Sequence, residues 1–224
     1  MKFLAKIIFL ISTIFLLFSC YTQKIELNAD RKSGKMTIDY YINNDYFQII
    51  SLIASNFQYD NEDYIDVMIL IDENKFKENF KKYEGITLDF VSIKKIKEGE
   101  YKGKIIISFK DFEKALALLP KGVSGLELIK TKDDITISQT VDLEKMDPDN
   151  IFLDFVNQLK DDDKEFYTLL TETAVFNFEL YTKTNIKKTE GIKLEGDGKI
   201  AKYSFKIKNL LDNKNKVLKF SITL

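Results

Sequence analysis

The chain contains one cysteine, Cys20, and this residue directly follows an N-terminal apolar run. Two lysines, Lys2 and Lys6, precede the run, which covers residues 7–18. A charged start, a short apolar stretch and a small residue before the cleavage point are typical of a secretory signal. The run is too short to span a bilayer comfortably. An exported chain with one cysteine has no internal disulfide, so its fold must be held by burial of apolar side chains.

The residues Leu17, Phe18, Ser19 and Cys20 resemble the lipobox of bacterial lipoproteins, whose cysteine is acylated and becomes the mature N-terminus. The resemblance implies a lipoprotein signal peptide at 1–19 and a lipid anchor, palmitate included, on Cys20. Phe18 departs from the commonest lipobox. Together with a Trp-free composition rich in Lys, Ile, Asn and Phe, it is similar to spirochaete lipoproteins. The alternative is an ordinary signal peptide that happens to be cleaved near a cysteine.

The composition narrows the chemistry. With 34 basic and 35 acidic residues the chain is near neutral, which argues against a nucleic-acid partner. There is no histidine and, once Cys20 is acylated, no thiol, so the commonest general base and metal ligands are missing. Neither the GxxxxGK[ST] nor the GxGxxG phosphate-binding pattern occurs. We therefore expect no enzyme and no cofactor. A hydrolase that uses only carboxylates is the least favoured of the three functions considered for this sequence.

Acidic residues cluster at 147–154 and at 161–163. The first cluster lacks the spacing of a calcium loop, because Ile151 and Phe152 occupy the places of the fifth ligand and the glycine. Capping of a helix by Asp147 explains that cluster, and the second is typical of a solvated helix end. We expect no metal site at either.

Alternation of apolar and polar residues predicts strands, and stretches of helical periodicity separate them. Three hairpins are expected, at 25–29 with 36–42, 86–96 with 104–109, and 126–130 with 135–143. Helices are expected at 46–57, 72–83, 112–119, 147–159 and 166–170. Late strands are expected at 175–181, 192–194, 200–207 and 217–224, separated by polar turns at 195–198 and 209–215.

This order predicts an α+β fold, with mostly antiparallel sheets of hairpins and several packed helices, in one extracytoplasmic domain over residues 20–224. The hairpin at 25–38 behind the lipobox, and the late strand at 175–180 followed by a glycine-rich turn, resemble LppM-type bacterial lipoprotein domains. The resemblance implies an extracytoplasmic α+β module associated with binding lipids or glycolipids. It carries over no functional residue.

Two groups of residues are candidates for binding. One is a set of phenylalanines on predicted inward faces, which either fill a core or line a slot for an acyl chain: Phe47, Phe57, Phe76, Phe80, Phe90, Phe109, Phe112, Phe152 and Phe155. The other is a basic hairpin end that either protects a sheet edge or contacts anionic headgroups: Lys94, Lys95, Lys97, Lys102 and Lys104.

The sequence thus predicts a non-enzymatic lipoprotein tethered to a membrane of the cell envelope, which binds a lipid or other apolar ligand. The alternative is a structural or protein-interaction lipoprotein that docks an envelope partner. Only residues 21–24 separate Cys20 from the first expected strand. Because this tether is short, we expect a periplasm-facing location.

Overall fold

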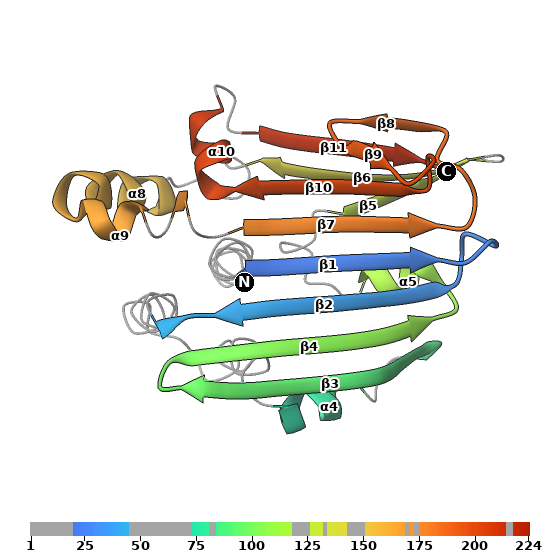
Figure 1. Cartoon of the computed structure of the whole chain (residues 1–224), viewed down its shortest axis with the longest axis horizontal. Coiled ribbons are helices and arrows are strands. Elements are labelled where there is room, and N and C mark those ends of the chain that lie inside the picture. Colours follow the sequence, from blue (N-terminus) through green and yellow to red (C-terminus); the bar gives the residue numbers. More distant parts are fainter. Residues whose placement is uncertain are drawn as a thin grey trace, which may run out of the picture.

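The computed structural model describes residues 20–44, 73–80, 84–117, 126–131, 134–142, 151–168, 171–172, 175–213 and 217–224. These residues form two β-sheets and short helices (Figure 1). In sheet order, the seven-stranded sheet consists of β3 (Ile86–Lys97), β4 (Glu100–Phe109), β2 (Gly34–Ile42), β1 (Cys20–Leu27), β7 (Val175–Thr182), β10 (Ile200–Lys206) and β9 (Lys193–Glu195). The four-stranded sheet consists of β5 (Leu126–Lys130), β6 (Ile135–Asp142), β11 (Val217–Thr223) and β8 (Lys188–Glu190).

The three hairpins that the alternation predicted are present. β1 pairs with β2, β3 with β4, and β5 with β6, all antiparallel. The exception is the pairing of β1 with β7, which is parallel and sets Tyr21 opposite Phe176. This contact between distant parts of the sequence puts β1 in the interior of the larger sheet.

The core lies between the inner faces of the two sheets. Ile25 on β1 and Phe178 on β7 are completely buried. The ring of Phe220 on β11 lies 4.9 Å from that of Phe178 and 4.9 Å from that of Tyr203 on β10. Full burial of a side chain of this size contributes about 1.5–3 kcal/mol relative to exposure. Facing aromatic rings therefore join the two sheets.

The helices are short, and most of them lie at the margins of the sheets (Figure 1). They are α4 (Glu73–Phe80), α5 (Phe112–Ala117), α8 (Ile151–Asp162), α9 (Lys164–Thr168) and α10 (Ile207–Asp212). α5 packs into the core through Phe112, whose ring stacks on Phe109 at 5.5 Å. α4 contacts the edge strand β3, where the carboxylate of Glu73 accepts a hydrogen bond from the backbone N–H of Ile93. α8 and α9 contact each other beyond one end of the sheets (Figure 1).

The expected α+β class with several packed helices is wrong, because the fold is mostly β. Helices of five to twelve residues cover little of either sheet in the described part of the chain. The core there is built chiefly by sheet against sheet. Periodicity located the strands but gave no measure of how much sheet each helix covers.

Individual elements also differ from expectation. The expected polar turn at 209–215 overlaps α10, and β8 was not predicted. Phe90 points outward and is 46% exposed, although its alternation placed it inside. A register shift between Leu88 and Phe90 adds a residue to β3, which moves Phe90 to the outer face. No helix in the described ranges is long and apolar enough to cross a membrane.

Candidate functional site

The outer face of the larger sheet carries a row of charged residues across four adjacent strands. Lys24 on β1 lies opposite Glu179 on β7, Glu179 lies opposite Lys202 on β10, and Lys202 lies opposite Lys193 on β9. Residues directly opposite each other on paired strands share a face of the sheet. The four charged side chains therefore lie on the face turned away from Phe178 and the core.

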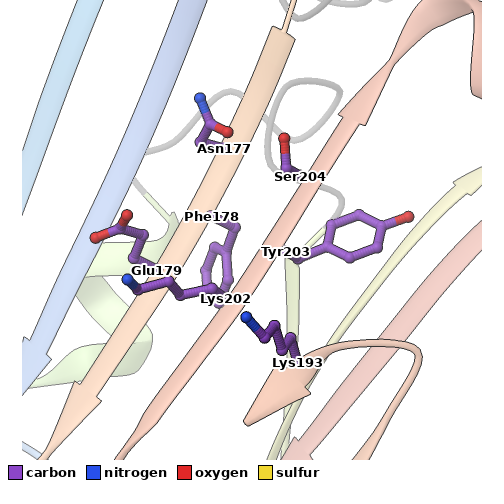
Figure 2. Close-up of a pocket in the computed structure, with 7 residues that line it drawn as sticks. All are labelled: Asn177, Phe178, Glu179, Lys193, Lys202, Tyr203 and Ser204. Atoms are coloured by element: carbon purple, nitrogen blue, oxygen red, sulfur yellow. The ribbon is translucent and has the colours of Figure 1, made fainter. Parts of the chain in front are cut away.

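A hollow of about 370 Å³ lies over this part of the sheet. It is open to solvent and lined by Asn177, Phe178, Glu179, Lys193, Lys202, Tyr203 and Ser204 (Figure 2). In Figure 2 the carboxylate of Glu179 and the ring of Tyr203 point in opposite directions from β7 and β10. The hollow is thus a trough on the polar face, while the Tyr203 ring belongs to the contact between the sheets.

Ion pairs and hydrogen bonds organise the charges of the trough. Glu195 accepts from Lys193 at 2.6 Å and from Lys202 at 3.0 Å. The hydroxyl of Tyr181 donates to Oε2 of Glu179 at 2.8 Å. The ammonium group of Lys24 lies 4.4 Å from the centroid of the Tyr181 ring, a cation–π distance. Each lysine of the row therefore has a glutamate partner, which is Glu26 for Lys24 and Glu195 for both Lys193 and Lys202.

Shifted pKa values keep Glu195, Lys202 and Lys24 charged. Hydrogen bonds from Lys193 and then Lys202 lower the pKa of Glu195. The hydrogen bond to Glu195 raises the pKa of Lys202, and the one to Glu26 raises the pKa of Lys24. A general acid or base needs a pKa near the working pH, and these shifts lead away from neutrality. The arrangement suits electrostatic contact better than proton transfer.

The lipidation residue of the sequence analysis lies at one end of the same sheet. Leu17, Phe18 and Ser19 are outside the described residues. Cys20 is the first residue of β1 and lies opposite Tyr41 of β2. The expected tether at 21–24 is therefore wrong, since these residues belong to the strand. An acyl group on Cys20 would be attached directly to the sheet.

The basic hairpin end predicted from the sequence lies at this same end of the sheet. Lys94, Lys95 and Lys97 are on β3, and Lys102 is on β4. Lys104, further along β4, lies 3.5 Å from Asp39 and so forms part of the charged outer face. The row through Lys193 and Lys202 was missed. The alternation of Asn177, Glu179 and Tyr181 with apolar residues indicated that these three side chains share an outer face. The sequence did not indicate which strands lie beside β7, so the row across the strands could not be assembled.

The predicted phenylalanines divide into three sets. Phe109 and Phe112 are buried in the core, which confirms their inward placement. Phe90 is exposed. The side chains of the remaining six lie outside the described part of the structure: Phe47, Phe57, Phe76, Phe80, Phe152 and Phe155.

Acidic side chains in the described residues do not converge as metal ligands would, since no group of three or more Asp, Glu, His or Cys comes together there. The cluster at 161–163 is exposed at the end of α8. In the cluster at 147–154, residues 147–150 lie outside the described part. The expectation of no metal remains a prediction.

No protein-family model and no curated protein matches the chain. Among solved structures, the chain is similar to the NMR structure of the folded domain of LppM from Mycobacterium tuberculosis. The identity is 12% and the TM-score 0.48, over 92% of this chain and 88% of that chain.

This neighbour is a lipoprotein domain of the kind that the sequence resemblance named, but a TM-score of 0.48 is too low to support the resemblance. At this similarity the neighbour assigns no ligand, partner or residue role to the present chain. The spirochaete likeness stays a prediction from composition.

Proposed function

We propose that this chain is a bacterial lipoprotein, acylated at Cys20, whose folded part is a non-enzymatic module of the cell envelope. The observation that carries the proposal is the lipobox-like Leu17, Phe18, Ser19 and Cys20 at the end of a signal-like apolar run. The position of Cys20 as the first residue of an interior strand supports it. Signal cleavage before Cys20 would leave the whole of β1 in place.

Attachment through Cys20 would hold the sheet directly against the membrane. Several acyl chains on one residue anchor a protein stably, whereas one chain binds only marginally. With no tether residues outside β1, the end of the sheet that contains Cys20 must face the bilayer. A location on the periplasmic side of the envelope is part of the proposal.

A non-enzymatic role is supported by the electrostatics of the trough. Ion pairing between Glu195 and the neighbouring lysines lowers the pKa of Glu195 and raises the pKa of Lys202, both away from neutrality. The chain also lacks histidine. Such a surface can bind and orient a charged partner without exchanging protons with it.

A lipid or other apolar ligand remains the finer proposal for what the module binds. The trough is open to solvent and lined by charged residues as well as apolar surface, and aromatic rings occupy the described layer between the sheets, at centroid distances of 4.9 Å. Neither feature favours a buried acyl chain. Native mass spectrometry of the protein purified from its own membrane would test this, because a retained lipid adds a discrete mass. An unliganded mass alone would contradict the lipid proposal.

The alternative, docking of an envelope protein, is favoured by one specific observation. β3 is a twelve-residue strand at the edge of the larger sheet. Edge strands offer unpaired backbone groups to a partner strand. α4 covers part of this edge, where Glu73 binds the N–H of Ile93. Crosslinking from β3 in intact cells should capture an envelope protein if this alternative is correct.

The lipoprotein proposal is tested by labelling cells with radioactive palmitate and partitioning their proteins in detergent. The wild-type chain should take up label and enter the detergent phase, and Cys20→Ala should take up none. Tyr21→Ala is the matched control, because it changes the next residue and leaves the cysteine. Wild-type protein that is unlabelled and enters the aqueous phase would contradict the proposal.

The periplasmic side is tested separately, by adding protease to intact cells. The protein should resist digestion until the outer barrier of the envelope is permeabilised. Digestion on intact cells would place it on the cell surface, while leaving the lipid anchor unaffected.

A further inference from the structure

The strand register shows which residues lie beside Cys20 across the larger sheet, as far as the edge strand β3. Cys20 on β1 lies opposite Tyr41 on β2, Tyr41 lies opposite Lys102 on β4, and Lys102 lies opposite Lys94 on β3. Neighbouring strands are about 4.8 Å apart, so Lys94 lies about 14 Å from Cys20 along this row. The anchor residue and these two lysines are therefore at one level of the sheet.

The hairpin of β3 and β4 continues beyond that level. β3 runs on through Lys95, Ile96 and Lys97 before the turn at Glu98 and Gly99. At about 3.3 Å per residue, the turn lies roughly 10 Å past the level of Cys20. Figure 1 shows the β3–β4 turn extending past the start of β1 at the same end of the sheet. We call residues 94–102 the hairpin tip.

Two lysines of the hairpin tip lie opposite each other, and no acidic side chain of the described residues balances their charges. Lys94 and Lys102 lie directly opposite on paired strands, and both are exposed. Neither has an acidic partner among the described residues, whereas Lys95 and Lys97 pair with glutamates of the same turn at 2.7 and 2.8 Å. Like charges directly opposite each other destabilise a strand pair. An anion beside the two lysines would remove that repulsion.

The hairpin tip also presents an apolar side chain in a fixed position. Ile96 is 56% exposed and lies between Lys95 and Lys97. Gly99 adopts φ +69°, and a Cβ built there would come within 2.2 Å of Oδ1 of Asn44. This close contact packs the turn against the segment that follows β2. An exposed apolar residue among lysines suits a membrane interface, where the apolar side chain can enter the acyl boundary while the ammonium groups stay among the headgroups.

We propose that the hairpin tip is a second membrane contact, which binds the headgroups of an anionic bilayer through Lys94 and Lys102 and inserts Ile96 at the interface. The inference rests on the proposed lipidation of Cys20, which sets this end of the sheet at the bilayer. The surface potential of anionic lipids extends about 8 Å at physiological salt, so only a projecting element near the anchor can use it. The two contacts together fix the orientation of the sheet on the membrane.

The experiment uses the mature lipoprotein, produced from the full chain and reconstituted into vesicles. Since Cys20 is blocked by its lipid, Ile96→Cys introduces a unique thiol for an environment-sensitive dye. Ile129→Cys is the matched control, because Ile129 is 55% exposed and lies opposite Thr136, near the start of β6. β6 begins at the end of the sheets opposite the start of β1 (Figure 1). The vesicles are either pure phosphatidylcholine or contain phosphatidylglycerol.

The dye at position 96 should shift to the blue on anionic vesicles and stay water-like on neutral ones. The dye at position 129 should stay water-like on both. Lys94→Gln with Lys102→Gln should lower the ratio of bilayer-bound to water-exposed tip roughly tenfold or more. Lys183→Gln with Lys199→Gln should leave that ratio unchanged. These exposed lysines directly follow β7 and directly precede β10, at the end of the sheet opposite the start of β1 (Figure 1).

The outcomes separate this inference from the proposed function. A water-like dye at position 96 on vesicles that carry the protein would overturn the tip contact and leave the lipoprotein intact. Equal shifts on neutral and anionic vesicles would overturn the role of the two lysines. Protein that fails to float with vesicles and accepts a second dye at Cys20 would overturn the lipidation, and the tip contact with it.

Discussion

The inner and outer faces of the larger sheet are built from the same strands but differ in what holds them. On β1 the inner Ile25 and Leu27 are buried, and the outer Lys24 and Glu26 pair with each other in solvent. β7 alternates in the same way, with Phe178 inside and Glu179 outside. Burial contributes kilocalories per side chain, whereas exposed ion pairs contribute little. The inner face therefore determines stability, and the outer face is free to carry binding.

The comparison is tested most severely by Phe178→Ala. Phe178 is fully buried and contacts Phe220 across the sheets, so its removal should lower the free energy of unfolding by about 3–5 kcal/mol. Urea denaturation of the mature protein measures this. Asn177→Ala, on the adjacent outer position, is the control and should have little effect. If the two variants lost the same stability, the proposed division of the faces would be wrong.

Gly103→Ala tests how closely the inner face is packed. A Cβ at Gly103 would come within 1.9 Å of Cζ of Tyr40, so the tyrosine ring would have to move. Overpacking of this kind should cost about 1–3 kcal/mol in urea denaturation. Tyr40→Leu in the same background removes the clash and should recover part of the loss. An unchanged midpoint for Gly103→Ala alone would show that the inner face is loosely packed.

Gln23→Leu tests the inner face with a substitution that should increase stability, whereas the previous two should decrease it. Gln23 is fully buried on β1, and its Nε2 donates only a long contact of 3.6 Å to Sδ of Met36. Its Oε1 has no partner in the described structure. Replacing such a side chain with an apolar one should raise the free energy of unfolding by about 1 kcal/mol. A clear loss of stability would mean that the amide makes a contact essential to the core.

Glu195→Gln on the outer face should have the smallest effect, a change in Tm of no more than about 2 °C at neutral pH. The pKa of Glu195 is lowered from 4.5 by Lys193 and Lys202, so its contribution is present above pH 4.5. It is lost as the pH falls through the lowered value. Wild type and variant should therefore converge in acid. A difference that grows on acidification would contradict this sign.

The three hairpins could be predicted because each is local. Alternation around a polar turn fixes both strands and their pairing, as in β1 with β2 and β5 with β6. The join of β1 to β7 could not be predicted. It depends on inner faces that complement each other only after folding, with Ile25 level with Leu180. The charged row from Lys24 to Lys193 depends on that join, so it was hidden for the same reason.

The fold class was predicted wrongly because the contribution of the helices to the core was overestimated. Periodic patterns such as Phe112, Ala115 and Leu116 correctly located α5. They did not reveal that aromatic contacts between strands, such as Phe178 with Phe220, would supply much of the core. The outward turn of Phe90 depends on one extra residue in β3, which a period-two pattern cannot register. The lipidation of Cys20 could be proposed from the sequence because its pattern lies in consecutive residues, and it stays a prediction.

The account depends most directly on the chemical state of Cys20. Mass spectrometry of the N-terminal proteolytic peptide, from protein extracted from its own membrane with detergent, measures that state in one step. The account predicts a peptide that begins at Cys20 and carries the added mass of a glycerol-linked diacyl group. A peptide that begins at any other residue, or an unmodified Cys20, would contradict the lipoprotein proposal and the orientation of the sheet derived from it.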